Sequence, residues 1–149
     1  LGYRGFKGDL YDGGLRVPGI VHWPGVVKAG SEYAGRVDFA DLHATLTQVA
    51  GIAPPPEIDG RSFAPIIGVG ASFSLRPYQV WYSPDRKQSA VLQGPWKAVW
   101  MRDTMRVFNL ERDPGELTDL RTAEPVVAAR LDSIRRVEDR RVQHPAKPR

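Results

Sequence analysis

The sequence predicts an α/β fold in two parts: a loop, a short strand and a helix come first, and a small antiparallel sheet of about four strands with a C-terminal helix follows. Three observations support this prediction. An apolar run at 20–23 precedes a segment with helical spacing at 38–50, four aromatic and β-branched runs lie between 78 and 110, and a second helical pattern begins near Pro125. The length of 149 residues and the 42% apolar content fit a folded chain with a core of its own.

The first part opens with a glycine-rich loop over residues 1–18. The run IVHW at 20–23 is predicted to be a short buried strand, because Pro-Gly pairs bound it on both sides. A helix is predicted over residues 38–50, with Asp38 as its N-cap, Asp41 in its first turn and Gly51 just past its end. Its inner face is predicted to consist of Phe39, Leu42, Leu46, Val49 and Ala50.

The second part follows a stiff, extended connector at 54–60 that opens with three prolines, and one helical turn within 62–67. Short turns separate the strands predicted at 78–82, 90–93, 96–102 and 106–110, and short connections imply an antiparallel meander. The last helix is predicted to have Pro125 at its first position. Its inner side is predicted to carry Val127, Leu131, Ile134 and either Val137 or Glu138. Beyond Val142 the chain is expected to fray.

Composition and charge exclude several classes of site. The net charge of +4 belongs to the residues from Arg135 onward, and no aromatic residues interleave with those arginines, so we expect no nucleic-acid binding. The sequence has no cysteine, which excludes disulfides, thiolate metal sites and a cysteine nucleophile within these residues. No apolar stretch reaches the roughly 18 to 20 residues of a membrane span, and the three histidines lack metal-ligand spacing.

The opening loop holds the candidate chemistry. Lys7 stands among glycines, which let the backbone approach a ligand closely, and an ammonium there suits a sulfate or phosphate. The other interpretation is an exposed, inert lysine in a surface turn. Asp9 and Asp12 are too few oxygen donors for a metal site, and we interpret Asp12 as an acceptor for backbone N–H groups or for Arg16.

An ordered series of motifs resembles the sulfatase family. The segment KGDLYDGGLRVP at 7–18 strongly resembles the family's G-K-x-x-x-[ED]-G-G-x-R-V-P. Further similar segments follow in the family's order and cover nearly the whole chain: WPG at 23–25, DLHATL at 41–46, GI at 51–52, IDGRSF at 58–63, GPWK at 94–97, FNL at 108–110, DPGE at 113–116 and DL at 119–120.

The resemblance implies the C-terminal portion of a type I, formylglycine-dependent, arylsulfatase-like sulfatase of the alkaline phosphatase-like superfamily. Lys7 would be the catalytic, substrate-binding residue that contacts the sulfate. Asp12, Gly13, Gly14 and Arg16 would support its loop. The formylglycine and the ligands of a Ca²⁺ or Mg²⁺ ion would lie upstream of this chain, which by itself would bind neither.

The resemblance also implies an organisation and a setting. Residues 1–68 would end the catalytic α/β domain, residues 77–142 would form a small C-terminal subdomain, and residues 143–149 would be a frayed basic tail. The partners would be the upstream catalytic domain and a sulfated small molecule or glycan, and the compartment would be periplasmic or extracellular.

The departures from the family pattern limit what this chain can do alone. It has no cysteine and no S-x-P-x-R, so the chain alone is expected to be inactive. Two alternatives stay open: a phosphonate or phosphodiester hydrolase of the same superfamily, and a non-catalytic binding module.

Overall fold

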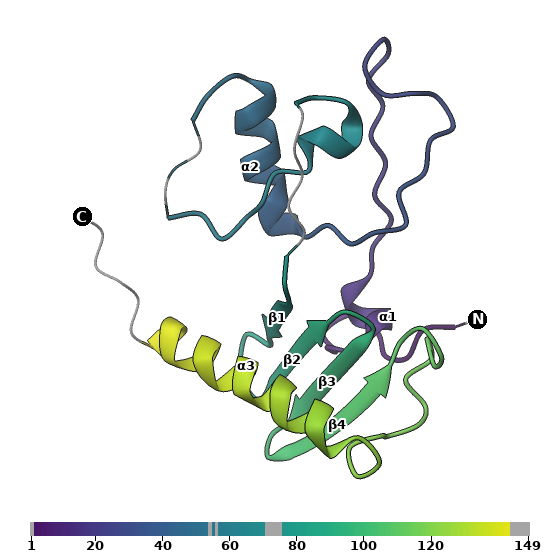
Figure 1. Ribbon diagram of the computed structural model, residues 1–149, viewed down its shortest axis with the longest axis vertical. Helices are drawn as coiled ribbons and strands as arrows, with labels where there is room; N and C mark the ends of the chain where they lie inside the picture. Colours follow the sequence, from purple (N-terminus) through teal and green to yellow (C-terminus); the bar gives the residue numbers. More distant parts are fainter. Residues whose placement is uncertain (1, 54, 56, 71–75, 144–149) are drawn as a thin grey trace. The chain divides into compact units, whose positions relative to one another are not determined.

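The computed structural model describes residues 2–53, 55, 57–70 and 76–143. In chain order its elements are α1 (Asp12–Leu15), α2 (Phe39–Val49), the 3-10 turn η1 (Ala64–Ile67), β1 (Gln79–Tyr82), β2 (Gln88–Gln93), β3 (Trp96–Met101), β4 (Thr104–Asn109) and α3 (Pro125–Gln143) (Figure 1). They form two units. The first joins the opening residues up to Val17 to the chain from Pro77 onward, and the second runs from Pro18 to Arg76.

The first unit is built on the predicted antiparallel meander, which the structure confirms. The strands lie in the order β1-β2-β3-β4, and every neighbouring pair is antiparallel. Each of the three hairpin connections holds one residue at positive φ: Arg86, Gly94 and Arg102. In the first connection, hydrogen bonds from the Ser83 hydroxyl and the Lys87 backbone N–H lower the pKa of the Asp85 carboxyl.

Helix α3 covers one face of this sheet (Figure 1). Leu131 is fully buried, and Val127 and Ile134 pack against the same apolar cluster, as predicted. Of the two alternatives one turn further on, Glu138 is buried and Val137 is 47% exposed. The Tyr78 hydroxyl donates to Glu138, which gives this buried carboxylate a partner. Helix α3 ends at Gln143, so the predicted fraying concerns residues outside the described ranges.

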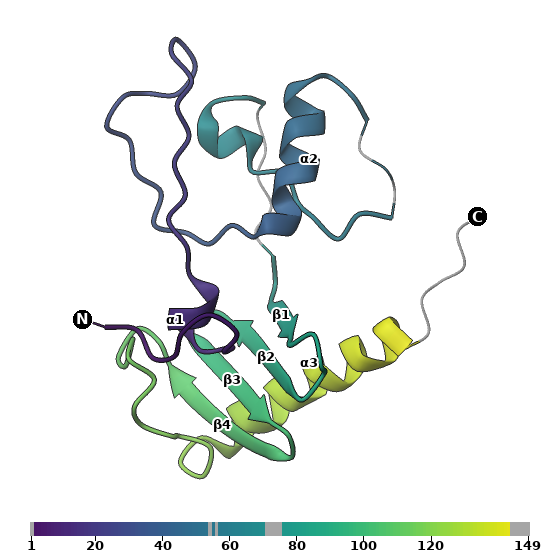
Figure 2. The ribbon, with the colours of Figure 1, turned by 180° about the vertical axis from the view of Figure 1, so that it is seen from behind.

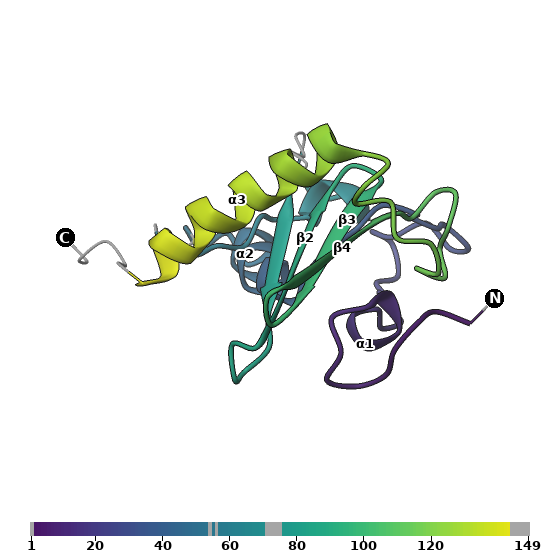
Figure 3. The same ribbon diagram turned by 90° about the horizontal axis from the view of Figure 1, so that it is seen from below.

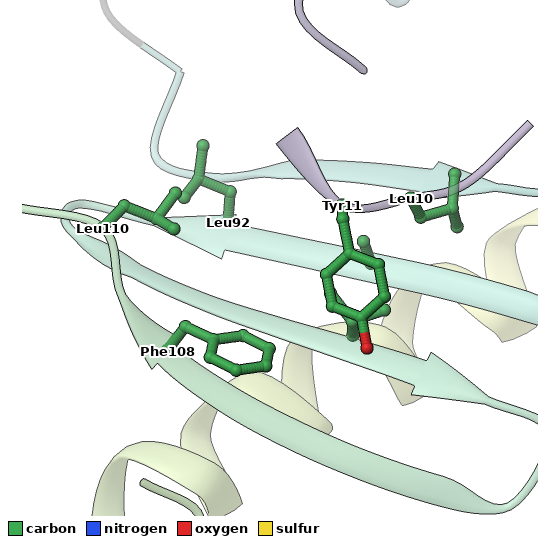
Figure 4. Close-up of a cluster of buried hydrophobic side chains, with 7 residues drawn as sticks. Leu10, Tyr11, Leu92, Phe108 and Leu110 are labelled. Carbon is green, nitrogen blue, oxygen red and sulfur yellow. The ribbon is translucent and has the colours of Figure 1, made fainter. Parts of the chain in front are cut away.

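The opening residues cover the opposite face. Figure 3 shows α3 and α1 on the two sides of the sheet, and in Figure 2 α1 lies in front of the strands. Leu10 and Tyr11 insert into a second cluster with Leu92, Phe108 and Leu110 (Figure 4). The Tyr11 and Phe108 rings meet edge to face, with centroids 6.0 Å apart.

The predicted segment 1–68 therefore divides at Val17 within this structure. The physical reason is the pair Leu10 and Tyr11, whose apolar surface is removed from water only against the sheet. The helical turn α1 was not predicted, since four residues that include two glycines have no helical periodicity. The assignment of residues 1–68 to a catalytic domain stays a prediction.

The second unit confirms the predicted helix and its ends. The Asp38 side chain accepts from Ala40 N, the Asp41 side chain accepts from Asp38 N, and the two form a capping box. Gly51 follows the helix at φ +70°, the left-handed conformation that a C-terminal glycine permits. The helical turn predicted within 62–67 is η1. Two of the three connector prolines lie outside the described residues.

Two predictions about this unit were wrong. Residues 20–23 form no strand, and Ile20 is 91% exposed. The predicted inner face of α2 is also turned outward, since Phe39 and Leu46 are 72% and 65% exposed, whereas Asp41, Ala44 and Thr45 are buried. A strand needs a hydrogen-bonding neighbour and an apolar face needs a covering element. The described residues supply neither of these at 20–23 or on the outer face of α2.

Candidate functional site

Lys7 lies at the exposed tip of a tight turn. Asp9 N donates to the Phe6 carbonyl at 2.9 Å, and the Asp9 carboxylate accepts from Phe6 N at 3.1 Å. Gly8, between them, has φ +102°, which favours glycine. This turn leaves the Lys7 side chain exposed at the end of a constrained loop, so the ammonium is open to an anion.

The loop closes on itself behind Lys7 through Gly13 and Gly14. Gly13 N donates to the Arg4 carbonyl at 2.7 Å. A Cβ on Gly13 would collide with the carbonyls of Arg4 and Gly5, and one on Gly14 would collide with those of Phe6 and Asp9. Only glycine at both positions allows residues 13 and 14 to approach the backbone of the first half of the loop this closely.

A buried ion network lies beneath the loop. The Lys97 Nζ is 2.7 Å from Asp12 Oδ1 and 2.8 Å from Glu116 Oε1, and the first of these contacts is also a directed hydrogen bond. Asp12 N donates to Glu116 Oε2 at 2.7 Å. Lys97 and Glu116 are fully buried and Asp12 is 5% exposed. We call Asp12, Lys97 and Glu116 the anchor triad.

Asp12 was a predicted residue of the loop, but its partners Lys97 and Glu116 were not predicted from the sequence. A signal was present, because Lys97 stands inside the apolar strand WKAVW, and a charged residue there must find a partner when it is buried. Which partner it finds could not be read from the sequence, since Asp12 is 85 positions away from Lys97.

Arg4 and Arg16 add two further cations around the triad. The Arg16 guanidinium is 3.7 Å from Asp12 Oδ2 and stacks over the Tyr3 ring, with its side chain 54% exposed. Arg4 donates to the Glu116 backbone carbonyl at 2.6 Å and lies over the Tyr11 ring. Both arginines thus contact residues of the opening loop, and Arg4 also contacts Glu116 of the triad.

The described residues do not fit the calcium or magnesium ion that the resemblance implies. No three His, Asp or Glu side chains among residues 2–53, 55, 57–70 and 76–143 come close enough together to hold a metal ion. Asp9 is engaged with Phe6 N and Asp12 with Lys97. We therefore derive no chemistry of this part of the chain through a metal. Within the same ranges, no helix is long and apolar enough to cross a bilayer.

The profile of the family described as N-sulphoglucosamine sulphohydrolase, C-terminal, matches residues 5–142. The chain belongs to this family, which confirms the resemblance to sulfatases.

Individual relatives agree with this membership. The choline-sulfatase of Rhizobium meliloti is 33% identical over 156 aligned positions, which cover 97% of this chain and 29% of that protein. A solved Bacteroides thetaiotaomicron protein from a locus for metabolism of multiple glycosaminoglycans superposes with a TM-score of 0.73 at 23% identity, over 91% of this chain and 31% of its own. A protein solved with its substrate, D-glucosamine-2-N,6-O-disulfate, superposes with a TM-score of 0.63 at 19% identity, over 83% of this chain and 28% of its own. The chain thus spans less than a third of the length of each.

Proposed function

We propose that this chain is the C-terminal part of a sulfuric ester hydrolase and that Lys7 binds the sulfate group in it. The observation that carries the proposal is the exposed ammonium of Lys7 at the tip of a loop in which Gly13 and Gly14 leave no room for a side chain. Membership of the sulfatase family supports the reaction class.

Lys7 would donate hydrogen bonds to the sulfate oxygens. As the S–O bond breaks, charge moves to the leaving oxygen, and a cation held in place beforehand stabilises that distribution without reorganising. Removing one preorganised donor of this kind typically costs about 2.7 to 4 kcal/mol of barrier. Gly13 and Gly14 would fix the loop, and Asp12 and Arg16 would support it from below.

The substrate we propose is a sulfated small molecule or a sulfated glycan. The family description names N-sulphoglucosamine, and one structural neighbour was solved with a disulfated glucosamine. Both are sulfated amino sugars, and the choline-sulfatase relative points to small sulfated molecules as well.

The partner we propose is a preceding catalytic domain of the same protein. It would supply the formylglycine and the metal ligands, and it would cover the apolar residues that the second unit exposes, such as Ile20, Phe39 and Leu46. This chain spans less than a third of its relatives, which leaves length for such a domain. A periplasmic or extracellular location completes the proposal.

The test is Lys7→Ala in the full-length protein, assayed with an aryl sulfate. We expect kcat/KM to fall by about 10² to 10³-fold, with the thermal unfolding midpoint unchanged because Lys7 is exposed. Lys87→Ala is the matched control, since the Lys87 side chain is 65% exposed in the β1–β2 turn. Equal activity of the two variants would contradict the role of Lys7. A preference for an aryl phosphonate over the aryl sulfate would favour the phosphonate hydrolase alternative.

A further inference from the structure

Glu116 holds both ends of the loop that carries Lys7. At the start of the loop, Arg4 donates to the Glu116 backbone carbonyl at 2.6 Å. At its end, the backbone N–H of Asp12 donates to the Glu116 carboxylate at 2.7 Å. Lys7 lies between these two attachments, so the contacts of one residue, 104 positions from Asp12, bound the loop on both sides.

Lys97 completes the attachment from the sheet. It extends from β3 and contacts the carboxylates of both Asp12 and Glu116. Strand β3 is central in the sheet, paired on one side with β2 and on the other with β4. The backbone of Lys97 is therefore held by both neighbouring strands, and its ammonium contacts the loop directly at Asp12 and indirectly through Glu116.

The backbone of Glu116 gives an independent indication of constraint. Its φ is +53°, a conformation that few residues other than glycine, asparagine and aspartate adopt. Such a conformation persists where the surroundings determine it. Here they consist of the Arg4 contact to its carbonyl, the Asp12 and Lys97 contacts to its carboxylate, and the bond from Glu116 N to the Asp113 carbonyl.

Packing alone does not call for charges at this place. Apolar side chains of similar volume often stabilise a protein as well as a buried ion network does. The network differs from apolar packing in direction, because the hydrogen bonds from Lys97 Nζ to Asp12 Oδ1 and from Asp12 N to Glu116 Oε2 each require a donor aimed at an acceptor. These two hydrogen bonds restrict the position of Asp12 relative to the sheet.

We propose that the anchor triad fixes the opening loop in the position that presents Lys7 to the sulfate. Lys97 and Glu116 are then positioning residues, which act on the substrate only through Lys7. The inference rests on the proposed function of Lys7, and it adds the residues on which that function depends.

The first test is hydrogen exchange of the full-length protein with Glu116→Gln, which keeps the shape of the side chain and removes its charge. Loss of one charge-assisted contact corresponds to about tenfold faster exchange, and we expect it in peptides covering residues 4–16, with peptides of β2 and β3 unchanged. Glu111→Gln is the matched control, an exposed glutamate of the same connection. Unchanged exchange of the loop in the Glu116 variant overturns the inference, whatever the activity.

The second test is a double-mutant cycle on aryl sulfate hydrolysis with Lys7→Ala. A positioning role predicts that Glu116→Gln lowers kcat/KM about tenfold or more in the wild type and less than about threefold once Lys7 is absent. Equal losses in both backgrounds overturn the inference, because the triad would then act independently of Lys7. Should the glutamine variant not fold, Glu116→Asp keeps the charge but shortens the reach to Asp12 N, and it is measured in the same two ways. A silent Lys7→Ala alone refutes the proposed function, and the exchange result then decides whether the triad holds the loop.

Discussion

Single residues decide how closely the opening loop folds. A Cβ on Gly13 or Gly14 would collide with backbone carbonyls, two at each position, so no other residue fits there. Gly8 completes the turn at a φ that favours glycine. The same loop carries Lys7, the residue proposed to bind the sulfate. The glycines that the fold of the loop requires and the lysine proposed to bind the sulfate therefore lie within the same eight residues, 7–14.

Replacement of Gly14 by alanine tests this at the residue scale. The added Cβ meets the carbonyls of Phe6 and Asp9, and overpacking of this kind costs about 1 to 3 kcal/mol. We expect Gly14→Ala to lower the free energy of unfolding of the full-length protein by this amount and to reduce sulfate ester hydrolysis, measured by urea denaturation and by kcat/KM.

The control for this substitution is Gly2→Ala. A Cβ on Gly2 would have nothing within 4 Å, and its φ is not in the left-handed region. We expect it to leave both quantities unchanged. Equal stability of the two alanine variants would show that the loop opens at no cost, and the self-packed loop would not hold Lys7.

At the scale of elements, buried polar side chains fasten α2 to the segment that follows it. Asp41 Oδ1 accepts from Arg61 N at 2.8 Å and from the Arg76 guanidinium, and Thr45 Oγ1 accepts from Phe63 N at 3.0 Å. Thr45 also donates to the Asp41 carbonyl. These contacts explain why the buried face of the helix carries Asp41 and Thr45.

Thr45→Val tests this attachment. The valine keeps the volume of threonine but leaves the buried N–H of Phe63 without an acceptor, which costs about 1 to 3 kcal/mol. We expect that loss in the free energy of unfolding of the full-length protein. Thr47→Val is the matched control two positions on, because its hydroxyl bonds only to carbonyls of its own helix, those of His43 and Ala44. Losses of equal size would mean that helix propensity, and not the Phe63 contact, determines the effect.

On the scale of the whole molecule, the two units differ in how they bury apolar surface. The sheet of the first unit is covered on both faces, by α3 and by the opening residues. The second unit exposes Ile20, Phe39 and Leu46 by more than half. Phe39 and Leu46 lie seven positions apart on one face of α2, and an exposed apolar helix face commonly marks an interface, which is why we propose that a preceding domain packs there.

Leu46→Ala in the full-length protein tests whether that surface is covered. Although Leu46 is 65% exposed in this chain, a covered leucine would lose about 2 to 5 kcal/mol on truncation. Leu117→Ala is the control, since Leu117 is 80% exposed in the first unit, and exposed sites usually change stability by less than about 0.5 kcal/mol. If Leu46→Ala is as silent as Leu117→Ala in thermal and chemical unfolding, no domain covers α2.

The sequence by itself determined the features that depend on neighbouring residues. The meander, the N-cap Asp38 with Asp41 in the first turn and the inward face of α3 were all predicted, because hairpin turns, caps and helical periodicity are set within a few positions of the chain. The sulfatase motifs could be recognised for the same reason, because each of them is a short local segment of the sequence.

Only the tertiary structure decided which distant groups meet and which apolar faces are covered. Asp12, Lys97 and Glu116 lie on three separate segments, and no local pattern shows that one buried lysine will contact both carboxylates. The apolar faces at 20–23 and on α2 were read correctly as apolar and wrongly as buried within this chain. Periodicity shows that a face is apolar, but burial also requires a partner surface, and a partner is a property of the assembled fold.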